Sequence, residues 1–281
     1  MNKFQTQIYH ITYTPEQKQI CLFFWGCNLN CKGCYCLRRI YSPMLEDFLG
    51  KHTDEPKEKA NKPKYFLLLD ELVNILSKYD FNSVILEGQE ASLDPAYSII
   101  TKTLHEKFGS YNVLLSNGLQ LPDLSHTDRV EIGLKAINDK LHTDYTGKSN
   151  SQILDNIRTL YKLNIDFFIE SVVIPGYIDS EEIELISKFI ANVDPKIVLI
   201  LLPYFKSGDN PWRRPTPFEM EQIQTLAKKH LSKVFYFRGD EQLEHRVISL
   251  FPPQIDILVH HEPDENKTTK LGHSKEVLCT N

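Results

Sequence analysis

Four cysteines crowd into one short stretch of the sequence, and their spacing predicts a metal centre. Cys27, Cys31, Cys34 and Cys36 stand within ten residues, directly behind the apolar run CLFFW. The first three have the spacing C-x-x-x-C-x-x-C, which puts three thiols on one short loop where they can face one metal centre. Thiolates suit zinc and iron–sulfur clusters. We therefore expect Cys27, Cys31 and Cys34 to be metal ligands.

The number of ligands distinguishes the metals that such a loop can hold. A structural zinc site takes four ligands, usually from two separate segments, and this sequence lacks a second cysteine pair. Cys36 is a candidate fourth ligand, but only one residue separates it from Cys34, which makes wrapping one tetrahedral ion awkward. Three ligands on a four-iron cluster leave one iron open, as catalysis requires. The loop alone thus favours an iron–sulfur cluster and leaves zinc as the alternative.

The other cysteines have simpler interpretations. Cys21 lies inside the apolar run, so we expect it to be a small buried hydrophobe. Cys279 is expected to belong to the tail of the chain. Cys36, if it is not a ligand, is either a packing residue or a second functional thiol.

Composition and charge exclude several other classes of function. The chain has 281 residues, of which 41% are hydrophobic, and a formal net charge of −5, so it can bury a core but offers no broad basic face to nucleic acid. Its longest apolar run is far shorter than the ~20 residues that span a bilayer, and its start lacks the order of a secretory signal. We expect a cytoplasmic protein that binds neither nucleic acid nor membrane, with reduced cysteines.

Short apolar runs alternate with helical patterns along the chain, and these elements must position the cysteine loop. The expected strands are 19–25, 82–88, 111–118, 129–135, 166–176, 196–204 and 233–237. The expected helices are 64–79, 95–108, 151–164, 180–193 and 216–230. Asn150 is expected to cap the third helix, and Thr216 with Pro217 to begin the last.

Such strands, rich in Val, Ile and Leu and separated by helices, are typical of parallel strands with crossover helices. We expect an α/β fold, specifically a partial (β/α)6-type TIM barrel. Ligands of that architecture bind at the carboxyl ends of the strands, and the cysteine loop directly follows the first strand. The core domain is expected to cover residues 1–240, with a flexible insertion at 42–64 and a C-terminal extension at 241–281.

The cysteine loop after a first barrel strand resembles the signature of the radical S-adenosylmethionine (SAM) superfamily. In that family three cysteines bind a 4Fe-4S cluster whose open iron takes the amino and carboxylate groups of SAM. One electron then splits the sulfonium and yields a 5′-deoxyadenosyl radical. The resemblance implies that Cys27, Cys31 and Cys34 hold this cluster as catalytic residues. It also implies a low-potential electron donor of the flavodoxin or ferredoxin type.

Two further motifs stand after the second and third of these strands. EGQEASLDP resembles the family's Gly-Gly-Glu-Pro, whose backbone receives the SAM amino group, and Gly88 and Glu90 match it. LSNG resembles the DTNG of pyruvate formate-lyase activating enzymes, and Ser116, Asn117 and Gly118 match it. The resemblance therefore implies that Gly88, Glu90, Ser116 and Asn117 contact SAM.

The resemblance continues along the later strands and covers roughly residues 20 to 205. EIGLKAINDKLHTDYTGKSN resembles the DLK…H…TG.SN segment of the activases, and Lys135 matches the lysine that meets the SAM carboxylate. FIESVVIPG matches the fifth-strand segment, and ILLPYF matches the sixth-strand LLPYH. These matches imply that Tyr35, Val172 and Tyr204 line the adenosine.

The chain also departs from the activases. Leu115 and Gly133 stand where those enzymes have two aspartates near the ribose, which also help to hold a monovalent cation, so the ribose contacts must differ here. Phe205 replaces a histidine, and the Asp-Gly-Pro-Gly that precedes the first strand in activases is missing.

Three functions are compatible with these features. The resemblance implies an activase that installs a glycyl radical on a partner enzyme. The first alternative is a radical SAM enzyme that modifies a small molecule or a protein or peptide side chain. The second is a zinc or iron–sulfur binding protein without catalysis. Arg213 and Arg214, beside Trp212, are candidates for gripping an anionic or peptide substrate, although Pro-Thr-Pro also reads as a plain helix start.

Overall fold

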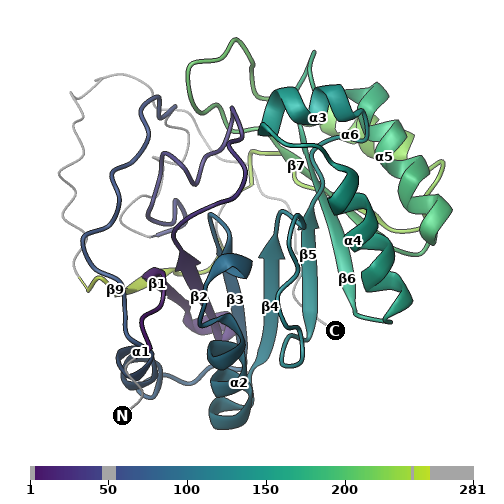
Figure 1. Ribbon diagram of the computed structural model, residues 1–281. Helices are drawn as coiled ribbons and strands as arrows, with labels where there is room; N and C mark the ends of the chain where they lie inside the picture. Colours follow the sequence, from purple (N-terminus) through teal and green to yellow (C-terminus); the bar gives the residue numbers. More distant parts are fainter. Residues whose placement is uncertain (1–3, 46–54, 242–243, 254–281) are drawn as a thin grey trace.

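The computed structural model describes residues 4–45, 55–241 and 244–253. Its strands form one nine-stranded sheet in the order β8-β7-β6-β5-β4-β3-β2-β1-β9, and helices cover the outer face of this curved sheet (Figure 1). Strands β2 to β8 are parallel. Within the described ranges β8 and β9 end the sheet without pairing to each other, so the α/β fold is a partial barrel, as the sequence predicts.

The elements follow the predicted alternation, with several shifts in their bounds. The strands are β1 (Ile8–Thr14), β2 (Gln19–Phe24), β3 (Ser83–Gly88), β4 (Tyr111–Ser116), β5 (Arg129–Gly133), β6 (Phe167–Val173), β7 (Val198–Pro203), β8 (Val234–Tyr236) and β9 (Ile248–Phe251). The helices are α1 (Leu69–Leu76), α2 (Tyr97–Phe108), α3 (Asp139–Thr146), α4 (Ser151–Lys162), α5 (Ser180–Val193) and α6 (Pro217–Ala227), with short 3-10 turns η1 (Pro15–Gln17) and η3 (Ala91–Leu93).

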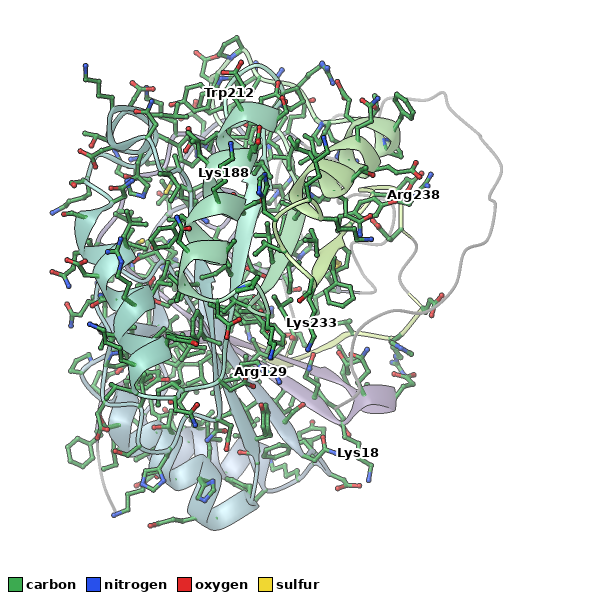
Figure 2. The ribbon with its side chains drawn as sticks, turned by 90° about the vertical axis from the view of Figure 1, so that its right-hand side faces the viewer. Lys18, Arg129, Lys188, Trp212, Lys233 and Arg238 are labelled. Carbon is green, nitrogen blue, oxygen red and sulfur yellow. The ribbon has the colours of Figure 1, made fainter. Side chains whose placement is uncertain are left out.

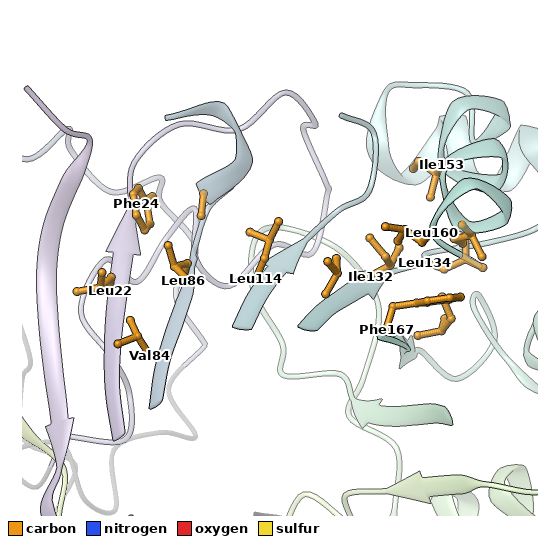
Figure 3. Close-up of a cluster of buried hydrophobic side chains, with 14 of the residues drawn as sticks. Leu22, Phe24, Val84, Leu86, Leu114, Ile132, Leu134, Ile153, Leu160 and Phe167 are labelled. Atoms are coloured by element: carbon orange, nitrogen blue, oxygen red, sulfur yellow. The ribbon is translucent and has the colours of Figure 1, made fainter. Parts of the chain in front are cut away.

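Alternate residues of each strand face the helices and form the main core. Figure 3 shows this layer, in which strand side chains such as Leu86 and Ile132 belong to the same buried cluster as Ile153 and Leu160 of α4. These four side chains are 0% exposed. Because the helix-facing positions are so fully buried, the strands need large aliphatic residues there, which explains the apolar runs in the sequence.

Strands β1 and β9 and helix α3 were not predicted. β1 turns through η1 and pairs antiparallel with β2, and β9 pairs antiparallel with β1. The ring of His10 on β1 bonds the carbonyl of Phe251 through Nδ1 at 2.7 Å. Residues 248–251 thus join the sheet although they fall within the segment expected to be a C-terminal extension. The division into domains stays a prediction.

The two predicted helix caps have different outcomes. Thr216 accepts a hydrogen bond from the Glu219 amide at 3.2 Å, and Pro217 occupies the first turn of α6, so that prediction is confirmed. Asn150 occupies the N-cap position of α4, as predicted, but its side chain makes no cap bond to the helix. It donates instead to the carbonyls of Ala136 and Ile137 at 3.0 and 2.7 Å. These carbonyls follow β5, so Asn150 fixes the chain there rather than the helix end.

Two expectations concern residues that are only partly described. Residues 46–54 of the expected insertion lie outside the described residues, and the remainder of 42–64 contains neither helix nor strand. Cys279 also lies outside them. None of the helices in the described ranges is long and apolar enough to cross a bilayer.

Candidate functional site

The cysteine loop begins after β2, at the carboxyl ends of the parallel strands (Figure 1). Its backbone is tied to the end of α3, because the amide of Asn30 donates to the carbonyl of Thr146 and that of Lys32 to the carbonyl of Tyr145, both at 2.9 Å. The ammonium of Lys32 also pairs with Asp144 at 2.6 Å. The loop is therefore held from β2 on one side and from α3 on the other.

Gly33 allows the middle of this loop to approach the barrel wall. A Cβ at this position would lie 2.8 Å from the ring of Tyr204 and 2.9 Å from the hydroxyl of Tyr145. Tyr204 is only 2% exposed, and its hydroxyl accepts from the Ser207 amide at 3.1 Å. Tyr204, predicted to line the adenosine, thus lies beneath the cysteine loop and supports it.

The three predicted ligands lie together on this loop with their sulfurs in different surroundings. Cys27 is exposed, whereas Cys31 and Cys34 are half-buried. Burial raises the pKa of the Cys31 thiol to about 12 and also raises the pKa of Cys34, while the nearby ammonium of Lys135 lowers both. Forming the thiolates therefore needs further positive charge at the loop, which bound iron supplies.

The donor set fits a 4Fe-4S cluster in chemistry. Three thiols come from one loop, and Cys27 Sγ accepts hydrogen bonds from the Leu29 amide at 3.4 Å and from Asn117 Nδ2 at 3.6 Å. Such donors stabilise the thiolate ligands of iron–sulfur clusters. Among the described residues no three His, Cys, Asp or Glu side chains converge on one point that would hold a single metal ion. Thiols that each bind a different iron need no such point.

Cys36 lies close to this set but in a different environment. Burial is the main cause that raises the pKa of its thiol, and Cys34 and Glu87 raise it further. Whether Cys36 is a packing residue or a second functional thiol stays a prediction.

The end of β3 is shaped by Gly88. Its φ is +105°, and a Cβ would lie 2.7 and 2.8 Å from the backbone N and O of Phe24. Only glycine fits such a close approach in this left-handed region. The side-chain Oε1 of Gln89 accepts a hydrogen bond from the backbone amide of Gly26 at 2.9 Å. The backbone amide of Gln89 donates to the Phe24 carbonyl at 3.0 Å. The turn after β3 thereby fixes the start of the cysteine loop.

Glu90 joins the ends of β3 and β4. Its carboxylate is 2% exposed and accepts from Ser92 Oγ at 2.6 Å, Ser116 Oγ at 2.9 Å and the Asn117 amide at 2.7 Å. The Ser92 amide adds a fourth bond at 3.2 Å. Burial raises the pKa of this carboxyl, and the hydrogen bonds counteract it. With its oxygens filled by protein donors, Glu90 positions the predicted SAM residues Ser116 and Asn117.

Asn117 connects β4 with the cysteine loop. Its Nδ2 donates to Asn28 Oδ1 at 2.7 Å in addition to reaching Cys27, and its Oδ1 accepts the Leu119 amide at 2.9 Å. Glu90, Asn117 and Cys27 therefore form one continuous chain of hydrogen bonds. The sequence motifs after the second and third predicted strands and the cysteine motif meet at this point.

Lys135 lies at the end of β5, where Gly133 makes room for it. A Cβ on Gly133 would lie 2.7 Å from Lys135 Nζ. The ammonium thus occupies the space beside Gly133 that a side chain at this position would share. The same charge lowers the pKa of Cys31 and Cys34. Lys135 is therefore the cation of the cysteine site.

The remaining predicted residues lie on the β6 and β7 side. Val172 is half-buried on β6, at an inward-facing position. The Tyr35 ring, next to Cys34 in the loop, lies 6.4 Å from that of Phe205, which follows β7. Val172 and Tyr35 thus flank the barrel mouth, and their contact with adenosine stays a prediction.

Three carboxyl groups inside the barrel were not predicted as functional. Glu87, Glu131 and Glu170 occupy inward positions of β3, β5 and β6. Burial raises the pKa of Glu87 to about 7 and that of Glu131 to about 8, and Glu131 also hydrogen-bonds Glu170. Cys21 hydrogen-bonds Glu87, so it is not the purely apolar filler that we expected. Acids at alternate positions of otherwise apolar strands are the sequence signal that could have revealed this group.

Comparison with known proteins gives the family. A family model described as the radical SAM superfamily matches residues 22–189. The chain belongs to the radical SAM superfamily. Enzymes of this family use a 4Fe-4S cluster and SAM, so the chain is a radical SAM enzyme with the cofactors that its cysteine loop suggests.

The curated relatives are activating enzymes in name. A Methanocaldococcus jannaschii protein assigned as a glycyl-radical enzyme activating enzyme is 27% identical over 232 residues, which are 80% of this chain and 82% of that protein. The pyruvate formate-lyase-activating enzyme of Clostridium pasteurianum is 24% identical over 221 residues, 76% of this chain and 87% of the enzyme. Among solved structures, Escherichia coli QueE has a TM-score of 0.50 at 15% identity and covers 83% of this chain and 94% of its own. It supports the fold alone.

Proposed function

We propose that this protein is an activase-like radical SAM enzyme that abstracts hydrogen from a partner glycyl-radical enzyme. The observation that carries the proposal is the chain of hydrogen bonds from Glu90 through Asn117 to Cys27, with Lys135 close to the other two cysteines. It joins the residues matched to the SAM site with those matched to the cluster.

In this proposal Cys27, Cys31 and Cys34 hold the 4Fe-4S cluster. When bound, the cluster and SAM supply a 5′-deoxyadenosyl radical after one electron arrives from a flavodoxin- or ferredoxin-type donor. Lys135 binds the SAM carboxylate by charge, and the backbone beside Gly88 receives the SAM amino group. Glu90 holds Ser116 and Asn117 in position, while Val172 and Tyr35 exclude water from the adenosine.

The partner is inferred from the relatives. Both curated relatives are named for activating another enzyme, and each aligns over more than three quarters of this chain. The departures at Leu115, Gly133 and Phe205 lie toward the ribose and substrate side, so the partner need not be pyruvate formate-lyase itself. A small molecule or peptide as the substrate is the alternative.

The proposal is tested anaerobically. The protein is reconstituted with iron and sulfide, reduced with dithionite and supplied with SAM, and 5′-deoxyadenosine is measured by mass spectrometry. Addition of catalytic amounts to a pyruvate formate-lyase, followed by electron paramagnetic resonance, tests for a glycyl radical. Both signals support an activase. A 5′-deoxyadenosine signal together with a stable mass change in a small molecule or peptide supports the alternative, and a full cluster without 5′-deoxyadenosine overturns the radical chemistry.

A further inference from the structure

Three successive side chains between β7 and α6 point to three different places. Trp212 stacks on Tyr177 with ring centroids 4.2 Å apart. Trp212 lies at the end of the molecule where the carboxyl ends of the parallel strands meet (Figure 2). Arg213 makes two bonds to Glu219 at 2.6 and 2.8 Å and so belongs to the start of α6. The guanidinium of Arg214 lies over the ring of Phe205 at 3.9 Å. The first two side chains have complete structural roles, whereas Arg214 does not.

Arg214 has no polar partner for its side chain in the described part of the chain. Its Nη2 is buried and makes no hydrogen bond. Partial burial lowers the pKa of Arg214, while Glu241, Tyr35 and Asp240 raise it. A buried guanidinium nitrogen without an acceptor is unfavourable, so its presence calls for an explanation.

The nearby acids are engaged elsewhere. Asp240 pairs with the guanidinium of Arg238 at 3.1 Å. Glu241 accepts the amides of Arg238 and Gly239, the latter at 2.8 Å. Both carboxylates influence Arg214 at a distance, but neither lies within ion-pair range of it. Arg214 is thus a surplus cation at this edge of the barrel.

Its position is next to the cysteine site. The guanidinium of Arg214 lies over the ring of Phe205, and the centroid of the Phe205 ring lies 6.4 Å from that of Tyr35, which directly follows Cys34. Phe205 comes shortly after the end of β7, and β8 is the last strand on this side of the open sheet. A group bound by Arg214 would therefore lie at the open side of the barrel, one aromatic ring away from the cysteine loop.

We propose that Arg214 binds a carboxylate of the substrate and so orients the substrate toward the site of hydrogen abstraction. A guanidinium that stacks on a ring presents its edge, and a planar carboxylate matches that edge with two hydrogen bonds. The ligand supplies both the missing acceptor and the missing negative charge. This inference rests on the proposed function, because it assigns the substrate class of the same site.

The carboxylate can come from two sources, an acidic side chain near the target glycine of a protein substrate or a small carboxylic acid. Three probes distinguish them: acetyl-Glu-Gly-Ala-amide, its neutral partner acetyl-Gln-Gly-Ala-amide, and acetate. Each is titrated into cluster-loaded protein without reductant and followed by ligand-observed NMR. Because no SAM cleavage is needed, the result does not depend on whether the radical chemistry occurs.

We expect the wild type to bind the Glu peptide at least fivefold more tightly than the Gln peptide. Arg214→Gln should abolish this preference, and Arg213→Gln, which removes the same charge one residue away, should keep it. A Glu peptide that binds tenfold more tightly than acetate indicates a protein source, and equal binding indicates a small acid. If no carboxylate probe binds, or if Arg214→Gln keeps the preference, the proposal is wrong.

A thermal melt separates binding from a structural role. Because the Arg214 guanidinium has no polar partner, Arg214→Gln is expected to melt at the wild-type temperature or above it. A melting temperature several degrees lower, together with an unchanged preference for the Glu peptide, would mean that Arg214 serves only to pack Phe205, which would overturn the proposal.

Discussion

The barrel mouth has two unlike halves. At the ends of β2 to β5 the polar side chains satisfy one another: Glu90 accepts four hydrogen bonds, and Asn117 uses both ends of its amide. At the ends of β6 to β8 aromatic rings dominate, and Arg214 keeps a buried nitrogen without a partner. The first half is hydrogen-bonded within itself apart from Gln89 Nε2, which is buried without a partner among the described residues, whereas in the second half the unpartnered group is a cation.

Under the proposed function, this difference matches what each half recognises. A cofactor that is the same in every family member can be held by a hydrogen-bonded frame, because preorganisation lowers the cost of binding. A substrate differs between members, so its half of the mouth is free to change. The sequence departures at Gly133 and Phe205 mark the border between the two, since Lys135 fills the space over the first and Arg214 covers the second.

The largest effect is expected at the cysteine loop. Cys31→Ala should leave fewer than four irons per chain and lower 5′-deoxyadenosine formation more than about 100-fold, because a third of the cluster ligands is lost. Iron analysis, absorbance and mass spectrometry measure this. Cys21→Ala on β2 is the control and should keep the cluster. A Cys31→Ala protein with a full, SAM-cleaving cluster would contradict the role given to the loop.

The next effect tests how tightly the cofactor half is built. Gly88→Ala should lower the free energy of unfolding by about 3 kcal/mol, because its Cβ would meet the Phe24 backbone at a φ that already disfavours alanine. Gly109 ends α2 at a φ of +64° with nothing within 4 Å of a Cβ. Gly109→Ala should therefore cost only about 1 kcal/mol. Urea unfolding compares them, and equal losses would mean that the close approach at Gly88 is unimportant.

The fold and the cofactor half were largely readable from the sequence, because their signals are local. Each buried strand is a run of aliphatic residues, and each motif follows its strand directly. The position of parallel strand ends then brings distant motifs together without further information. In this way Glu90, Asn117 and Cys27 could be expected at one site before their hydrogen bonds were known.

The rest depends on contacts that no local pattern encodes. β9 is a four-residue strand that pairs with the edge of β1, which lies more than 230 residues earlier in the chain, so its formation depends on this distant pairing. The close approach of the Tyr204 ring to Gly33 in the cysteine loop also depends on a contact between distant segments, and the contact of Tyr204 with adenosine stays a prediction. Arg213 and Arg214 are adjacent residues of the same type. Arg213 forms an ion pair with Glu219 and Arg214 does not, and this difference depends on where Glu219 lies in the fold.

A smaller effect separates positioning from plain stability within the cofactor half. Glu90→Gln replaces one carboxylate oxygen by an NH2 group, which faces the donors of Ser92, Ser116 or Asn117 and displaces them. SAM binding should therefore weaken about tenfold, or by about 1.4 kcal/mol. Asp94→Asn is the matched control, since Asp94 accepts the amides of Gln7 and Ala96 at 2.6 and 2.7 Å and does not touch β4. It should change the Kd for SAM less than twofold. Similar losses in both variants would assign Glu90 a purely structural role.

The smallest effect concerns the interior, where the two halves meet at Glu131 of β5 and Glu170 of β6. Burial and Glu170 raise the pKa of Glu131 from 4.5 to about 8. Between these values the folded protein holds a proton on Glu131 that the unfolded chain releases, so the contribution of Glu131 to stability is fully present below about pH 4.5 and is lost as the pH rises toward 8.

Glu131→Gln should remove part of this slope, on the order of 1 kcal/mol in the unfolding free energy between pH 5 and pH 8. Glu219→Gln is the control, because hydrogen bonds from Arg213 lower the pKa of Glu219 to about 2 and its contribution changes only below pH 4.5, with the opposite sign. Urea unfolding at the two pH values measures both. An unchanged slope in Glu131→Gln would mean that Glu131 is ionised in the folded protein and that the halves share a charged interior.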